Sequence, residues 1–179
     1  MCNTLVAKGG VMSKTNLCVF GLIKEFADDI AKDLAIRLDM YYANVEEIIE
    51  FELIDLKFME EVCGLDYLNK KELSIVRRLC TYDNTLMNIN FNKLNSNKFL
   101  ESVKKNCLII YIEQSKKEYK RMLDSNGTTD NEKKICMQIF DDRHRISKNI
   151  ADITIDCSDI GKQEILDKII TEILKIYVK

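Results

Sequence analysis

The sequence has no proline, a single histidine and no long apolar run. Because it also has no low-complexity stretch and no internal repeat, nothing marks a linker, and its 179 residues predict one domain with a substantial core. No apolar run approaches the roughly 20 residues that a membrane-spanning helix needs, so we expect no membrane span. The N-terminus lacks the charged-then-apolar layout of a secretory signal, so we expect a cytoplasmic protein.

Positive charge is not in excess either. The chain has 27 lysines and arginines against 29 aspartates and glutamates, which gives a formal net charge of −2. Dedicated nucleic-acid-binding domains normally gather basic side chains into patches or stripes. We therefore expect no nucleic-acid partner.

The seven cysteines form no CxxC pair, and only His144 accompanies them as a nitrogen ligand. A structural zinc site needs four such ligands at characteristic spacings, so the sequence predicts no metal site. Several cysteines stand inside apolar runs, where a thiol behaves as a small buried hydrophobe. We predict core thiols at Cys2, Cys18, Cys63, Cys80, Cys107, Cys136 and Cys157.

The first eleven residues, MCNTLVAKGGV, show no apolar periodicity and precede a second methionine, Met12. Codons for residues 8–12 can be written AAA-GGA-GGT-GTG-ATG, which places a purine-rich ribosome-binding sequence ahead of a start codon. Two interpretations follow: translation starts at Met12, or residues 1–11 are a disordered extension. In both cases the predicted folded domain spans residues 12–179.

From Met12 onward, short apolar runs alternate with longer segments in which apolar residues recur with helical spacing. The expected strands are Leu17–Phe20, Met40–Ala43, Thr85–Ile89, Cys107–Ile112 and Ile153–Asp156. The expected helices are Phe26–Leu38, Val45–Val62, Lys70–Tyr82, Ser96–Lys104, Lys116–Leu123, Glu132–Phe140 and Lys162–Ile176, with a polar loop at Asp124–Asp130.

Apolar strands that alternate with helices are typical of βαβ units, in which a parallel sheet is buried on both faces. The predicted fold class is therefore α/β, with three α/β/α layers around a five-stranded parallel sheet. Sheets of this class bind ligands beyond the carboxyl ends of their strands. We expect a protein partner or an acidic metabolite at that edge.

The predicted first strand ends in a glycine, in the segment LCVFG, and a helix follows it. The helix runs into the segment LAIRLDMYYANVEEIIE, and the last strand, DITID, precedes the final helix. This order resembles that of the shikimate kinases. The resemblance covers about Lys14 to Lys179, and it implies the P-loop kinase topology of enzymes that phosphorylate shikimate with MgATP. The resemblance rests on the order and spacing of the elements, because most of the family's catalytic and ligand-binding motifs are replaced in this sequence.

The phosphate-binding loop of such kinases has the pattern G-x-x-x-x-G-K-[ST], whose glycines, lysine and hydroxyl hold phosphate and magnesium. Counted from Gly21, the last three positions are Phe26, Ala27 and Asp28. We expect Asp28 and Asp29 to place carboxylates at the N-terminus of the helix, where they stabilise its dipole and repel a triphosphate.

Other elements that the resemblance implies are also replaced. Ala43 and Val45 occupy the positions of the family's Asp-x-Asp, which binds magnesium and the substrate hydroxyl. Asn69 occupies the position of the family's substrate-binding arginine. The glycine triplet aligns with residues 90–92, and the lid DSNGTTDNEKK has neither arginine nor proline. Since the loss of one such electrostatic contact typically costs about a hundredfold to a thousandfold in rate, we expect no catalysis by the family's mechanism.

Two arginines and a lysine remain as candidate site residues. Arg121 matches the residue that packs on the adenine side in the family, or it lies on a solvated helix face. Arg143 matches an arginine that meets the acid substrate, or it pairs with Asp141 or Asp142. Lys24 lies inside the loop, either as a replacement for the missing lysine or as an exposed loop residue.

The leading prediction is a shikimate-kinase-like pseudoenzyme, which lacks catalysis, acts as a binding or regulatory module and is expected to hold no cofactor. The alternative is an active shikimate kinase or another ATP-dependent small-molecule kinase, with ATP and Mg at a rebuilt phosphate site. In that alternative the nucleotide contacts are Gly21, Lys24 and Arg121, the substrate contact is Arg143, and Asp28 or Asp29 binds magnesium.

A third possibility is a partner subunit that assembles with an active enzyme. In this hypothesis Phe26, Tyr41 and Phe91 line the ligand-binding edge and make it apolar. An exposed apolar patch there favours a protein partner.

Overall fold

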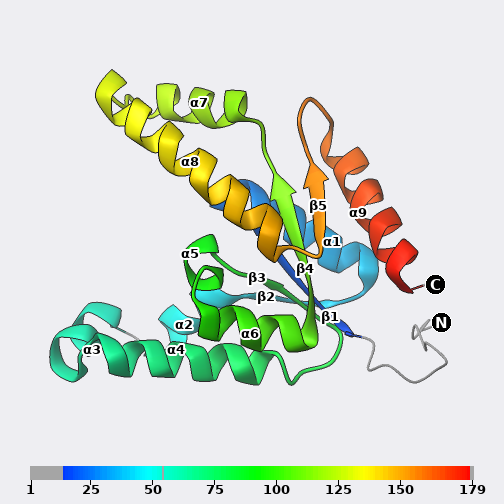
Figure 1. The fold of residues 1–179 in the computed structure, drawn as a ribbon. Helices are drawn as coiled ribbons and strands as arrows, with labels where there is room; N and C mark the ends of the chain where they lie inside the picture. The colour runs from blue at the N-terminus through cyan, green and yellow to red at the C-terminus, as the bar shows by residue number, and fades with distance from the viewer. Residues whose placement is uncertain (1–13, 54, 178–179) are drawn as a thin grey trace.

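The computed structural model describes residues 14–53 and 55–177. Five strands form one parallel sheet in the order β2-β3-β1-β4-β5 (Figure 1). The strands are β1 (Asn16–Gly21), β2 (Tyr41–Asn44), β3 (Thr85–Asn88), β4 (Cys107–Glu113) and β5 (Ile153–Asp156). The predicted α/β class and its parallel sheet are confirmed. The predictions for residues 1–11 and Met12 lie outside the described residues.

Helices cover both faces of the sheet. They are α1 (Lys24–Leu38), α2 (Val45–Leu53), α3 (Leu56–Cys63), α4 (Leu65–Leu79), α5 (Phe91–Leu94), α6 (Asn97–Asn106), α7 (Lys116–Ser125), α8 (Asp130–Ile150) and α9 (Lys162–Tyr177). In the part of the chain that the structure describes, none of them is both long and apolar enough to cross a lipid bilayer.

The core consists of two apolar clusters, one on each face of the sheet. Along β1, Leu17 and Val19 pack with α1 and α9, whereas Cys18 and Phe20 pack on the other face with α2, α4 and α6. This alternation follows from the two-residue period of a strand. Because both faces are covered, the central strands are apolar along nearly their whole length, as the run CLIIYI of β4 shows.

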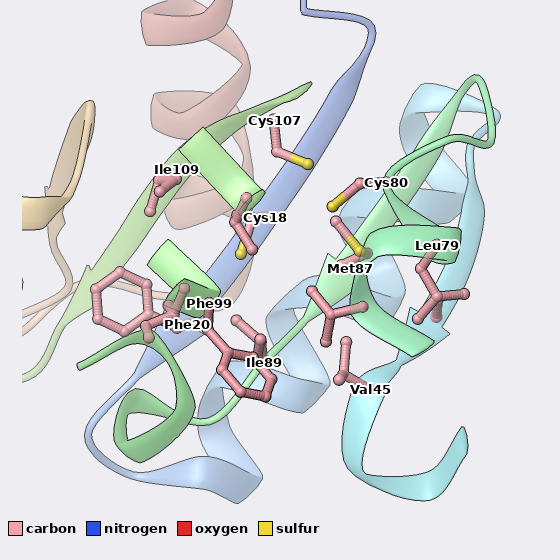
Figure 2. Close-up of a cluster of buried hydrophobic side chains, with 14 of the residues drawn as sticks. Cys18, Phe20, Val45, Leu79, Cys80, Met87, Ile89, Phe99, Cys107 and Ile109 are labelled. Carbon is pink, nitrogen blue, oxygen red and sulfur yellow. The ribbon is translucent and has the colours of Figure 1, made fainter. Parts of the chain in front are cut away.

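Four of the predicted core thiols are buried, and Figure 2 shows three of them, Cys18, Cys80 and Cys107, in one cluster. Cys157 is buried in the second cluster. The prediction is wrong for Cys63, which is exposed, because no residue of α3 is buried. Cys136 is partly exposed, and Cys2 lies outside the described residues.

The helix expected over Val45–Val62 is two helices. The first ends at Leu53, and Asp55 caps the second, because its carboxylate accepts a hydrogen bond from the Phe58 N–H at 2.9 Å. The next helix, α4, begins at Leu65 and not at Lys70, directly after Gly64, whose φ of +81° suits glycine.

The polar loop expected over Asp124–Asp130 is shorter than predicted. α7 continues to Ser125, and α8 begins at Asp130 with a capping box in which Thr129 and Glu132 bond each other's backbone N–H. The helix expected over Glu132–Phe140 continues to Ile150, because its last turns pack against the sheet. Arg143 therefore lies on α8.

Candidate functional site

A small cavity lies at the edge of the sheet where the parallel strands end. Its volume is about 60 Å³. Sites for small molecules usually enclose roughly 300–1,000 Å³, so this cavity has room for a few water molecules and not for a nucleotide. It is lined by Gly21, Leu22, Lys24, Ala27, Glu46, Asn88, Ile89, Asn90, Phe91, Asn92 and Arg143.

The junction between β1 and α1 forms one wall of the cavity. Only residues 22–23 separate the strand from the helix, and α1 begins at Lys24. The N–H of Ala27 already donates to the carbonyl of Ile23 at 3.2 Å, as in any helix interior. A phosphate-binding nest needs successive backbone N–H groups that point into a loop. Here the N–H of Ala27 is bound within α1.

Gly21 is required by close packing. A Cβ at this position would lie 2.9 Å from the Cβ of Ala27 and 3.3 Å from the carbonyl oxygen of Ile112. Ala27 is itself buried. The glycine thus lets the end of β1 approach both α1 and β4.

Asp28 is held by side chains from three elements. Its Oδ1 accepts hydrogen bonds from the hydroxyl of Tyr42 and from the amides of Asn44 and Asn88, each amide at 3.0 Å, and its Oδ2 pairs with Lys32 at 2.7 Å. Burial raises the pKa of this carboxyl, but the hydrogen bonds from Lys32, Tyr42 and Asn88 outweigh burial and leave the pKa below its usual value. The carboxylate therefore joins α1 to the ends of β2 and β3.

The expectation that Asp28 and Asp29 sit at the N-terminus of the helix is wrong, because α1 starts at Lys24 and places both in its second turn. Glu25 is the acidic residue of the first turn, where the helix dipole acts. Asp29 points to α9 instead, where Lys162 pairs with it at 2.8 Å and with Asp33 at 2.7 Å.

Glu46 forms the acidic side of the cavity. Its carboxylate accepts a hydrogen bond from the backbone N–H of Asn90 at 2.9 Å. Burial raises the pKa of Glu46, although that hydrogen bond and the positive charge of Lys24 partly oppose the shift. The side chain of Asn90 caps α5 by accepting from the N–H of Asn92 at 2.8 Å. These contacts order the turn between β3 and α5.

Lys24 and Arg143 bring positive charge to the cavity. Both line it and both are exposed. The expected pairing of Arg143 with Asp141 or Asp142 is wrong, since Asp141 pairs with Lys116 and Asp142 with Arg145. Instead, the Arg143 guanidinium lies over the ring of Phe91, 5.7 Å from its centroid.

Arg121 does not line the cavity and lies exposed on α7. Among the residues proposed as apolar lining, only Phe91 is correct. Phe26 packs against the second core cluster, and Tyr41 is exposed at the amino end of β2, opposite the ligand-binding edge.

A larger groove of about 630 Å³ lies beyond α5, between α4 and α6. Asn69 lines it together with Lys70 and Lys98, and Asn92 lines both this groove and the cavity. Its other lining residues are Asp66, Leu73, Lys93, Ser96, Asn97 and Phe99. The groove has the size of a small-molecule site and a surplus of positive charge.

Four side chains of this edge were not predicted from the sequence: Tyr42, Asn44, Glu46 and Asn88. Their bonds connect positions far apart in the chain, such as the 60 positions between Asp28 and Asn88. One signal was present: an asparagine ends both β2 and β3, at the edge where parallel strands place their ligands.

The acidic side chains of this edge do not form a metal centre. Within residues 14–53 and 55–177, no group of three or more histidine, cysteine, aspartate or glutamate side chains is arranged to hold an ion. Two residues were considered for magnesium. Both oxygens of Asp28 already bind donors of this chain, and Asp29 pairs with Lys162. The donor set therefore does not fit magnesium as the residues stand.

The fold is that of the P-loop kinases. A shikimate kinase from Acinetobacter baumannii in complex with shikimate is similar, with a TM-score of 0.75 and 15% identity over 93% of this chain and 97% of that one. A shikimate kinase from Aquifex aeolicus has a TM-score of 0.70 and 16% identity over 88% and 95%. A dephospho-CoA kinase from Campylobacter jejuni has a TM-score of 0.62 and 15% identity over 91% and 98%.

No protein-family model matches the sequence, and no curated protein sequence does. At these identities the similar structures establish the fold and leave the activity to be argued from the site.

Proposed function

We propose that this chain is a shikimate-kinase-like pseudoenzyme, which transfers no phosphate and binds an acidic small molecule at the carboxyl edge of its sheet. The observation that carries the proposal is the start of α1 at Lys24, ahead of position 27, where the kinase pattern places its lysine. Helix occupies the segment that a phosphate-binding loop needs, and buried Ala27 replaces the lysine.

The electrostatics of the edge support the same conclusion. A transferring phosphoryl group is stabilised almost entirely by positioned positive charge and metal. Asp28 lies at the position of the metal-binding hydroxyl, and its two oxygens bind Lys32, Asn44 and Asn88. Magnesium would have to displace these donors and leave buried amides unpaired, which costs about 1–3 kcal/mol for each group.

An acidic ligand suits the charges that remain. Lys24 and Arg143 face the small cavity, and Lys70 and Lys98 face the adjoining groove. The similar structure from Acinetobacter baumannii holds shikimate, which is an acid. Asn92 lines both the cavity and the groove. A carboxylate bound beside Asn92 would therefore lie between the cations of the cavity and those of the groove.

The second candidate function is a small-molecule kinase with a rebuilt phosphate site. One observation favours it: Lys24 lines the cavity, so a cation is present near the missing lysine. In that case Lys24→Ala abolishes phosphate transfer, whereas in a pseudoenzyme there is no transfer to abolish.

The test is a thermal-shift and phosphotransfer series with ATP, ADP, magnesium and shikimate. A ligand that binds only the native state raises the melting temperature by mass action. We expect a shift with shikimate or a related carboxylate, none with MgATP, and no ADP formation. Lys98→Ala and Arg143→Ala should reduce the shift, and Lys168→Ala, an exposed lysine of α9, is the matched control.

ADP formed in step with a phosphorylated acid would refute the pseudoenzyme. A flat response to every acid tested, with no turnover, would remove the metabolite part of the proposal.

A further inference from the structure

We propose that the outer face of α3 docks a partner protein through a basic amphipathic helix. α3 packs against α2 and α4 and lies at the free end of the molecule (Figure 1). Its apolar and polar residues lie on opposite sides of the helix, yet none of its residues is buried. This inference concerns a surface away from the cavity and holds whether or not phosphate is transferred.

The apolar residues of this face are large and exposed. Phe58 and Val62 are one helical turn apart on α3, with exposed fractions of 58% and 63%, while Leu56 packs on the core from the other side of the helix. Leu65, which begins α4, is 55% exposed, and Phe51 at the end of α2 is 84% exposed. Large apolar side chains gathered on one short segment are typical of an interaction site.

The charge around this face selects the partner. Residues 50–66 contain six carboxylates and a single basic residue, Lys57, although Glu52 pairs with Arg78 and Asp55 caps α3. Glu60 and Glu61 lie on α3 beside the apolar pair and are exposed. Two copies of this surface would bring like charges together, which opposes self-association through it. A helix with an apolar stripe and a lysine or arginine rim satisfies both the apolar and the acidic side chains.

The probe is a labelled synthetic helix with a leucine face and a lysine rim, and its control is the same helix with glutamate in place of lysine. Binding to the full chain is measured by fluorescence anisotropy at low and high salt. We expect the basic helix to bind, the acidic helix not to bind, and high salt to weaken binding because exposed charges are screened.

Two variants locate the site. Phe58→Ser with Val62→Ser removes the apolar anchors, and Glu60→Lys with Glu61→Lys reverses the rim. Each should weaken binding at least about tenfold. Ile36→Ser removes an apolar side chain of α1 that is more exposed than Phe58 and Val62, and it should leave binding unchanged. All these side chains are exposed, so each variant should keep the circular-dichroism spectrum and melting temperature of the native chain.

Three results overturn the proposal. One is equal binding of the acidic helix, and another is basic-helix binding that is absent or unaffected by both α3 variants. The third is a dimer in analytical ultracentrifugation that Phe58→Ser with Val62→Ser dissociates, because the occupant would then be a second copy of this chain.

Discussion

The guanidinium of Arg143 lies over the ring of Phe91, and the two side chains, which come from α8 and α5, both line the cavity. The arginine is exposed, whereas the phenylalanine is buried. Within residues 14–53 and 55–177 no carboxylate pairs with Arg143, so the contact holds an unneutralised cation beside the cavity. It keeps the charge of Arg143 available to an acidic ligand.

The Arg143–Phe91 contact should be measurable by a double-mutant cycle. Cation–π pairs at exposed sites contribute about 0.5–1 kcal/mol. We expect that much coupling between Arg143→Ala and Phe91→Leu in urea unfolding. Arg121→Ala, which removes an arginine that does not line the cavity, should show no coupling to Phe91→Leu. Coupling of zero for the Arg143 pair would show that the stacking contributes nothing to stability.

Gly21→Ala should destabilise the chain. The new Cβ would lie 2.9 Å from the Cβ of buried Ala27, and overpacking of this kind costs about 1–3 kcal/mol. The matched control is Gly161→Ala, where no heavy atom lies within 4 Å of the new Cβ. Urea unfolding of both variants checks the prediction, and equal midpoints would show that the end of β1 relaxes freely.

Asp28→Asn should lower stability at neutral pH, and the loss should shrink as the pH falls. The pKa of Asp28 is lowered in the native state, because hydrogen bonds from Lys32, Tyr42 and Asn88 outweigh the opposing effect of burial. Its contribution is therefore fully present above its unfolded-state pKa, near 3.9, and is lost as the pH falls through the lower native value. Unfolding free energies at neutral pH and near pH 3 measure the difference.

Asp29→Asn is the control for that experiment. Asp29 is an exposed neighbour on the same helix that pairs with Lys162. Exposed ion pairs contribute only about 0–1 kcal/mol, so its loss should be smaller than that of Asp28→Asn. A larger loss of stability in Asp29→Asn than in Asp28→Asn would show that Asp29 supplies the stabilising carboxylate of α1.

Thiol reactivity should follow burial. Burial raises the pKa of the Cys18 thiol, and Cys80 and Cys107 are buried in the same cluster (Figure 2). We expect a thiol reagent to modify exposed Cys63 first and the three clustered thiols only on unfolding. Peptide mass spectrometry identifies each modified cysteine. Early modification of Cys107 in the native chain would contradict the packing of β4 against β1.

The local patterns of the sequence predicted the sheet well. The strand at Ile153–Asp156 has the predicted bounds. β3 and β4 differ from the prediction by one residue at one end, and β1 and β2 differ by one residue at both ends. Strand burial and alternation are local properties, which explains this agreement. The helix ends were predicted less well: Asp55 and Thr129 cap helices through hydrogen bonds that depend on the backbone path.

The sequence by itself determined the fold class and the strand bounds to within one residue, and it named Lys24 and Arg143 as candidate site residues. Only the tertiary structure decided that α1 starts at Lys24, that Asp28 is held by Asn88 from a strand 60 positions away, and that Arg143 stacks on Phe91. The physical reason is that patterns of burial repeat along the chain, whereas the partners of a polar side chain are set by which distant segments pack beside it.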